Sequence, residues 1–391
     1  MQPDAAYILT AKAVRERCGL VFAAAERGDT PHFRLHLDRL EEAGQFVAAV
    51  SRQRYPDLRV PPHSRWRHFF AGGTDRAALV APGQDLAETA RSRTDLTILS
   101  VLLDAGAGVE WRYCEAETGQ VFARSEGLGV ASFRAMQAGL FSVDQEHRWR
   151  ADAASLAALT PAVLGAAMQH CDSNALAGFA GRVDLLRRLG EVARNNPVVF
   201  GHRARLGNLY DHWSRQSSTI SAPQILRTLL VALGPIWPGR PLGDCGKHRA
   251  VPGDGLVPFH KLSQWLAYSL VEPLQDAGMT VTELDGLTGL AEYRNGGLFL
   301  DLGVVEPRDP SLVSRMLDPQ DEAVVEWRAL TVILLDRLAE RVRALLGKSA
   351  AELPLACVLE GGSWEAGRRI AISRRPDGSA PLTIASDGTL F

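Results

Sequence analysis

Residues 321–346 read DEAVVEWRALTVILLDRLAERVRALL. Apolar residues recur there at helical spacing with charged residues between them, which predicts one long amphipathic helix. The same periodicity predicts further helices at 14–28, 35–52, 94–103, 183–193, 223–233 and 259–273. The sequence therefore predicts a mainly α fold built as a large helical unit.

Residues 108–124, GVEWRYCEAETGQVFAR, break the helical pattern. Their alternation on both sides of a Glu-Thr-Gly turn predicts a small β-hairpin between Trp111 and Phe122, added to the helical body. No internal repeat or clean linker divides the chain. We therefore expect a single α-rich domain over 1–391, with two packed helical lobes, about 1–220 and 221–391, as the alternative.

Composition excludes several classes of protein. The 391 residues are 46% hydrophobic and 23% charged, which is unlike a disordered or fibrous chain. Lysine and arginine (43) nearly balance aspartate and glutamate (45), so the net charge is −2. Without a global basic field we expect neither nucleic acid nor a membrane as partner, and the sequence leaves the oligomeric state open.

The cysteines indicate the compartment. All five (Cys18, Cys114, Cys171, Cys245 and Cys357) are far apart in the sequence, and no CxxC motif occurs. This spacing speaks against a disulfide framework or a cysteine zinc site and favours reduced thiols. The N-terminal residues also lack the apolar region of a signal peptide. We expect a cytoplasmic protein without metal or cofactor.

Common phosphate, dinucleotide, metalloprotease and serine-hydrolase motifs are missing from the sequence. The densest chemical signal begins at residues 254–270, DGLVPFHKLSQWLAYSL, where His260, Lys261 and Gln264 fall within one helical turn. A cation with an amide beside it, near a helix N-terminus, suits a phosphate or carboxylate. The alternative is a lysine that reaches from a helix start to solvent.

Residues 284–305, LDGLTGLAEYRNGGLFLDLGVV, place Asp285, Glu292, Arg294 and Asp301 among apolar residues and glycines. Glycine lets the backbone approach a ligand closely. Carboxylates in such a setting can hold a leaving group, a sugar hydroxyl or an attacking water. The alternative is that Glu292 and Arg294 simply form an ion pair.

Three further segments carry weaker signals. Residues 63–73, HSRWRHFFAGG, mix basic and aromatic side chains, including Trp66 and His68. Glu326 and Arg328 flank a tryptophan before an apolar run, and Arg368 follows a Gly-Gly turn, where an arginine can bind phosphate or carboxylate. Solvated surface charges explain these arginines and glutamates equally well. Residues 234–254 are rich in glycine, proline and charge, which is typical of a functional loop.

Together these segments resemble the uracil-catabolism (Urc/Urg) family of fungi and bacteria, long described as a domain of unknown function, over residues 11–391. The pathway implied by the resemblance converts uracil to its nucleotide, opens the ring and releases urea through a ribosylurea-type intermediate. Such a route needs an N-ribosyl hydrolase. A non-catalytic nucleotide or metabolite sensor is the alternative, while a DNA glycosylase is disfavoured by the net charge of −2.

A more distant likeness supports the hydrolase. FHKLSQWLAYSL resembles the F-x-K-x-x-Q segment of the queuosine 5′-phosphate N-glycosidases of queuine salvage, and LDGLTGLAEYR resembles their D-x-L-T-x-x-A-D-Y-R segment. The likeness implies a helical core akin to DNA glycosylases and a carboxylate that assists N-glycosidic cleavage. Glu292 stands where that family has aspartate, and the following NGGLF also departs from it.

These observations define the expected site. We expect Glu292 to activate water or stabilise a cation at C1′, with Arg294 keeping it ionised; Asp285 is second, for the leaving urea or base, and Asp301 third. We expect Lys261 to bind the phosphate of a phosphorylated riboside. The full expected substrate-binding set is Lys261, Gln264, His260, Phe259, Tyr293, Arg294, Trp66, His68 and Arg368.

Overall fold

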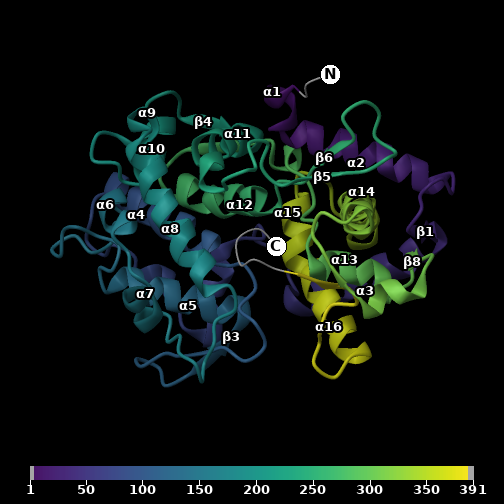
Figure 1. Ribbon diagram of the computed structural model, residues 1–391, viewed down its shortest axis with the longest axis horizontal. Helices are drawn as coiled ribbons and strands as arrows, with labels where there is room; N and C mark the ends of the chain where they lie inside the picture. The colour runs from purple at the N-terminus through teal and green to yellow at the C-terminus, as the bar shows by residue number, and fades with distance from the viewer. Residues whose placement is uncertain (1–3, 386–391) are drawn as a thin grey trace. The chain divides into compact units, whose positions relative to one another are not determined.

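The computed structural model describes residues 4–385, and helices dominate it (Figure 1). The expected mainly α fold is confirmed. The chain forms two compact units, each assembled from separate segments. The first unit comprises 4–63, 242–264 and 283–385, and the second comprises 64–241 and 265–282. This interleaved division differs from two lobes that meet near residue 220.

The first unit contains the longest helix, α14 (Glu322–Leu346). Its elements are α1 (Ala5–Ile8), α2 (Ala11–Glu26), β1 (Phe33–Leu35), η1 (Leu37–Arg39), α3 (Leu40–Arg54), β5 (Cys245–Lys247), β6 (Leu256–Pro258), the start of α12 (Lys261–Asp276), η5 (Leu284–Gly286), α13 (Tyr293–Asp301), β8 (Val305–Pro307), η6 (Pro310–Ser314), β9 (Met316–Leu317), α14 (Glu322–Leu346), α15 (Leu355–Val358), η7 (Leu359–Ser363), α16 (Trp364–Arg374) and β10 (Thr383–Ile384).

Helix α14 is the centre of the first unit. Figure 1 shows it nearly end-on, and it packs against α2, α3 and α13. Its buried Val325, Ala329 and Val332 join Phe259 and Ala291 in one apolar cluster. Phe259 and Ala291 directly precede the segments that carry Lys261 and Glu292, so the core itself fixes where those segments start.

The close approach of α13 to α14 depends on a glycine. A Cβ added at Gly296 would lie 2.5 Å from the Trp327 ring, and the Trp327 indole donates a hydrogen bond to the Gly296 carbonyl (3.1 Å). The sequence pattern gave no helix at residues 293–301, because two glycines interrupt it; the contact with α14 supplies the stability that local propensity lacks.

The second unit is also helical. Its elements are η2 (Arg65–Gly73), η3 (Ala77–Leu79), α4 (Leu86–Leu102), β2 (Arg112–Cys114), β3 (Val121–Ala123), α5 (Arg124–Gln137), α6 (Ala153–Ala157), α7 (Pro161–Ala167), α8 (Phe179–Arg194), α9 (Pro197–Phe200), α10 (Asn208–Ser214), β4 (Thr219–Ser221), α11 (Ala222–Leu233), η4 (Gly234–Ile236), the remainder of α12 and β7 (Thr280–Thr282).

The expected β-hairpin is confirmed, because β2 pairs antiparallel with β3 and Tyr113 lies opposite Phe122. The structure adds four strand pairs that the sequence did not predict: β1–β8, β4–β7, β5–β6 and β9–β10. Each has two or three residues per strand, which is too short to leave an alternating pattern. The helix expected to start at residue 35 begins instead at Leu40, because residues 33–35 form β1 and pair with β8.

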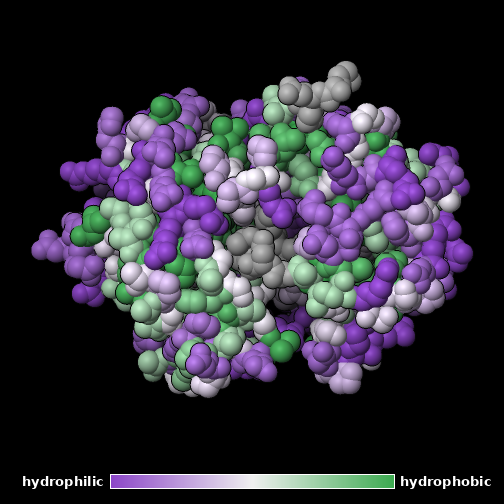
Figure 2. All heavy atoms as spheres, in the orientation of Figure 1, coloured by the Kyte–Doolittle hydropathy of each residue, from purple (hydrophilic) through white to green (hydrophobic). Residues whose placement is uncertain are grey.

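Polar and apolar side chains are interspersed on the face shown in Figure 2. The exposed large apolar residues include Val198, which is 80% exposed, and Val109, which is 71% exposed. Within residues 4–385, no helix is long and apolar enough to cross a membrane.

A π-helical turn, η7, joins α15 to α16, and its second glycine contacts α3. A Cβ at Gly362 would lie 2.6 Å from the Val47 carbonyl oxygen and 2.5 Å from the Ser51 hydroxyl. We expect Gly362→Ala to lower the free energy of unfolding by roughly 1–3 kcal/mol, measured by urea denaturation, because backbone atoms must shift.

Gly19→Ala, within α2, is the control for that substitution, since nothing lies within 4 Å of its added Cβ. It should stabilise the protein by about 0.5–1 kcal/mol. If the two variants were equally stable, the close packing of η7 on α3 would be refuted.

Candidate functional site

A buried ion pair joins the two sequence segments that carry the expected site. Asp244, 7% exposed, accepts hydrogen bonds from Nη1 (2.8 Å) and Nη2 (2.6 Å) of Arg328, which is 3% exposed. The same carboxylate accepts from the backbone N–H of Lys261 (3.1 Å) at the start of α12. Arg328 Nε donates to the Ala291 carbonyl (3.4 Å), next to Glu292. One guanidinium therefore holds both segments.

The surroundings of this pair keep it charged. Burial alone would raise the pKa of Asp244, but the charge and hydrogen bonds of Arg328 outweigh burial and hold that pKa below its ordinary value. The Arg328 guanidinium also lies over the Phe259 ring, with its carbon 4.0 Å from the ring centroid. Phe259 thus supports the ion pair from inside the core.

Glu292 occupies the N-cap position of α13. Its Oε2 accepts from the N–H of Arg294 (2.7 Å) and its Oε1 from the N–H of Asn295 (2.6 Å). Helices prefer the shorter Ser, Thr, Asp or Asn at this position, so a buried glutamate here is unusual. Each oxygen keeps further acceptor capacity toward a ligand or water.

The protonation of Glu292 differs from expectation. Burial raises the pKa of this carboxyl above its ordinary value, although the charge of Lys261 and the two backbone N–H groups act in the opposite direction. Arg294 was expected to hold Glu292 ionised through an ion pair. Its side chain instead donates to the Gly378 carbonyl (2.8 Å) and lies over the Tyr293 ring at 5.0 Å. The expected Glu292–Arg294 ion pair is therefore corrected, although the charge of Arg294 still acts to lower the Glu292 pKa.

Lys261 is the first residue of α12 and is partly exposed. Its charge acts on Glu292, so the structure places the expected cation and the expected carboxylate near each other. Within residues 4–385 its ammonium group makes no hydrogen bond or ion pair. An ammonium group whose hydrogen-bond donors are unused within the folded chain can bind an anionic ligand.

Gln264 links the two segments rather than pointing away from them. Its Nε2 donates to the Phe259 carbonyl (2.9 Å) and to the Thr288 hydroxyl (2.7 Å), and its Oε1 accepts from the Thr288 N–H (2.8 Å). Both amide protons are thus used inside the protein. The structure gives this expected ligand-binding residue a positioning role.

His260 has a similar anchoring contact. It is 1% exposed, adopts a positive φ of 49°, and its Nε2 donates to the Ile8 carbonyl (2.9 Å). Burial lowers its pKa, so the imidazole is neutral and adds no positive charge to a phosphate site.

The two other candidate carboxylates are held in ion pairs of their own. Asp285 accepts from Arg343 (2.8 Å) and from the Leu355 N–H (2.6 Å). Asp301 accepts both terminal nitrogens of Arg375 (2.8 and 2.6 Å). Asp301 also ends α13, about 13 Å along the helix from Glu292 at 1.5 Å per residue. The structure therefore does not bring Asp301 beside Glu292 as a second carboxylate.

The remaining expected residues fall in different places. Trp66 and His68 belong to the second unit, where the Trp66 indole donates to the Ser269 carbonyl (3.0 Å) and His68 packs edge-on against Trp265 at 6.0 Å. Arg368, in the first unit, lies 6.0 Å from the Trp364 ring centroid.

The first unit contains a further buried carboxylate, Glu360, to which the sequence assigned no defined role. Glu360, in η7, contacts His63 Nδ1 (2.9 Å), Arg54 Nη2 (2.9 Å) and the Tyr55 hydroxyl (3.1 Å). Burial would raise its pKa, but His63 and Arg54 hold the pKa below the ordinary value. Within residues 4–385, no group of three or more His, Cys, Asp or Glu side chains is placed to hold a metal ion.

The geometry defines a helical protein with a buried carboxylate, a nearby lysine and a rigid support beneath both. A family profile described as "Protein of unknown function (DUF1688)" matches residues 7–391, and the chain belongs to this family. It is 38% identical to Protein urg3 of Schizosaccharomyces pombe over 405 residues, which covers 99% of this chain and 98% of that protein.

A second relative, Uracil catabolism protein 4 of Lachancea kluyveri, is 35% identical over 434 residues and covers 98% of both chains. The expected membership of the uracil-catabolism family is confirmed.

Substitutions of the Asp244–Arg328 pair should be costly one at a time. We expect Asp244→Asn or Arg328→Met to lower the free energy of unfolding by about 3–5 kcal/mol, because each leaves one buried charge without its partner. The double variant should lose less than the sum of the single losses. Urea denaturation checks both expectations.

Arg249→Gln is the surface control, since Arg249 pairs with Glu322 but is 67% exposed, and it should change stability by less than about 1 kcal/mol. Because the folded-state pKa of Asp244 is depressed, its contribution is complete above pH 3.8 and is lost as pH falls through the lower folded pKa. Additive single losses at neutral pH would contradict the pairing.

Proposed function

We propose that the chain is an N-ribosyl hydrolase of uracil catabolism. Its substrate is a ribosylurea-type or related phosphorylated riboside, and its products are urea or a base and a ribose phosphate. One relative carries uracil catabolism in its name, and the segments of Lys261 and Glu292 resemble those of queuosine 5′-phosphate N-glycosidases. The observation that carries the proposal is the buried Glu292 carboxylate, which two backbone N–H groups hold in place and on which the charge of Lys261 acts.

The reaction explains why the carboxylate is needed. Cleavage of the C1′–N bond builds positive charge at C1′ while the bonding electron pair leaves with the urea nitrogen, which then takes up a proton. A water molecule adds to C1′ and loses a proton. Glu292 in its ionised form stabilises the developing cation and accepts the proton from water. A raised pKa makes it a stronger base than an exposed glutamate.

Positioning supports the same role. The two backbone N–H groups fix the Glu292 carboxylate in one orientation, so its free lone pairs have a defined direction. The Asp244–Arg328 pair and the Gln264–Thr288 bonds hold Phe259–Lys261 against the Glu292 segment. Such rigid support is what an electrostatic site needs, because the groups need not reorganise during reaction.

The second candidate function is a non-catalytic metabolite-binding protein of the same pathway. The observation that favours it is that Glu292 already serves as an N-cap, a structural role that requires no chemistry. A sensor needs only the Lys261 contact to phosphate, whereas a hydrolase also needs the Glu292 carboxylate. The substitutions below separate the two functions.

Glu292→Gln should retain substrate binding and lose turnover by roughly 10²-fold or more, because an amide is neither a base nor a negative charge. The measurement is release of urea from ribosylurea 5′-phosphate, with binding followed by calorimetry. Asp301→Asn is the matched control and should keep near-normal turnover per folded molecule. A Glu292→Gln protein with normal turnover would refute the assignment.

Lys261→Ala should raise KM for the phosphorylated substrate by about tenfold or more, as expected for losing a charged hydrogen bond of about 1.5–3 kcal/mol. The same variant should change KM far less for the riboside without phosphate, because that substrate has no phosphate group for Lys261 to bind. Lys12→Ala, at a side chain that is 76% exposed, controls for net charge. An unchanged KM for the phosphorylated form would remove Lys261 from the site.

A further inference from the structure

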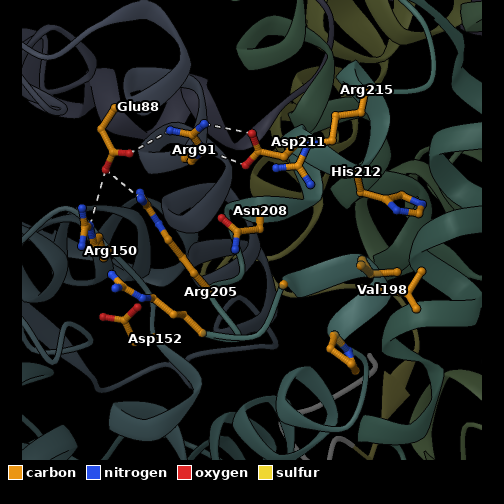
Figure 3. Close-up of a pocket in the computed structure, with 14 residues that line it drawn as sticks. Glu88, Arg91, Arg150, Asp152, Val198, Arg205, Asn208, Asp211, His212 and Arg215 are labelled. Carbon is orange, nitrogen blue, oxygen red and sulfur yellow. Dashed lines mark hydrogen bonds and ion pairs between the residues drawn. The ribbon is translucent and has the colours of Figure 1, made fainter.

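The second unit contains a polar pocket built from residues that the proposed reaction does not use. Its volume is about 290 Å³, near the lower end for small-ligand sites. It is lined by segments around α4, α9 and α10 and by residues near 150, all within the second unit (Figure 3). Five arginines and three carboxylates face it, which leaves an excess of two positive charges.

Two of these arginines are structural. Arg205 is bound by Asp95 (2.7 Å) and Glu88 (2.7 Å), and Arg91 donates to both oxygens of Asp211 (2.7 and 2.9 Å). In Figure 3, dashed lines join Glu88 to the guanidinium groups of Arg91, Arg150 and Arg205. These contacts fix the wall of the pocket and leave little of either arginine for a ligand.

The three other arginines of the lining have guanidinium N–H donors that can bind a ligand. Arg150 has only longer contacts, 3.5 Å to Glu88 and 3.8 Å to Asp144. Arg203 and Arg215 are exposed, and within residues 4–385 neither side chain makes a hydrogen bond or ion pair. Guanidinium groups suit phosphate oxygens in particular, since their paired N–H donors match the spacing of two oxygens.

We propose that this pocket is a second binding site, for the phosphate group of a small phosphorylated metabolite. A phosphate monoester carries about −1.5 to −2 charges at pH 7, which matches the excess charge of the lining. Pro197, Val198 and Val199 add an apolar wall against which an organic body can lie. The small volume of the pocket and the chain's net charge of −2 argue against a nucleic acid strand.

The site does not depend on the proposed hydrolase activity, and the test keeps the two apart. Calorimetry on the Lys261→Ala protein, with ribose 5-phosphate and inorganic phosphate as probes, isolates the pocket of the second unit. We expect binding of both probes to persist there, with ribose 5-phosphate tighter because of the apolar wall. Arg203→Gln/Arg215→Gln in that background should weaken both by at least about tenfold.

A second variant places a negative charge in the pocket and leaves all five of its arginines in place. Val198→Glu, at a side chain that is 80% exposed, should also weaken phosphate binding. Arg59→Gln, at a side chain that is 90% exposed in the first unit, should have no effect.

Several results would overturn the site. These are unchanged binding in both pocket variants, an equal loss in Arg59→Gln, or no binding at all in the Lys261→Ala protein. An oligoribonucleotide that bound far more tightly than ribose 5-phosphate would overturn it as well.

Discussion

The ion pair between Asp244 and Arg328 is the interaction on which the candidate site depends. Both charged groups are almost fully buried, so water does not solvate them. Each charge is stabilised inside the protein by the opposite charge of its partner. Through this pair, α14 in the core holds the backbone of Lys261 on one side and of Ala291 on the other. The distance between cation and carboxylate is therefore set by the core and not by flexible loops.

The position of Glu292 shows a conflict between stability and function. An aspartate or serine would cap α13 with a shorter side chain and fewer rotamers to lose. Glutamate reaches the same two N–H groups but is buried at the cost of a raised pKa, which disfavours its ionised form. Departures from the best local choice tend to fall at functional sites. This departure lies at the position that the likeness to queuosine 5′-phosphate N-glycosidases assigns to the acid.

The sequence predicted much of the fold and part of the site. Helical periodicity found α2, α8, α11 and α14, because each presents one continuous apolar face to a core. Lys261 and Glu292 were predicted through motif resemblance, and the structure places them near each other.

Asp285 and Asp301 were placed at the site because charges among apolar residues suggested chemistry. Their partners, Arg343 and Arg375, lie 58 and 74 residues away, so spacing could not reveal the pairs. Asp244 was hidden for the same reason, within a segment rich in glycine and proline. Arg328 lies inside an apolar helical run, and a charge in that setting requires a buried partner. The sequence therefore indicated that such a partner exists, but it did not identify the partner.

The proposed hydrolase is tested most directly by its products. The purified wild-type protein is incubated with ribosylurea 5′-phosphate, and free urea and ribose 5-phosphate are quantified together over many turnovers. We predict that the two products appear in equal amounts and in large excess over protein. Binding of the compound without release of either product would contradict hydrolysis and leave the chain a metabolite-binding protein.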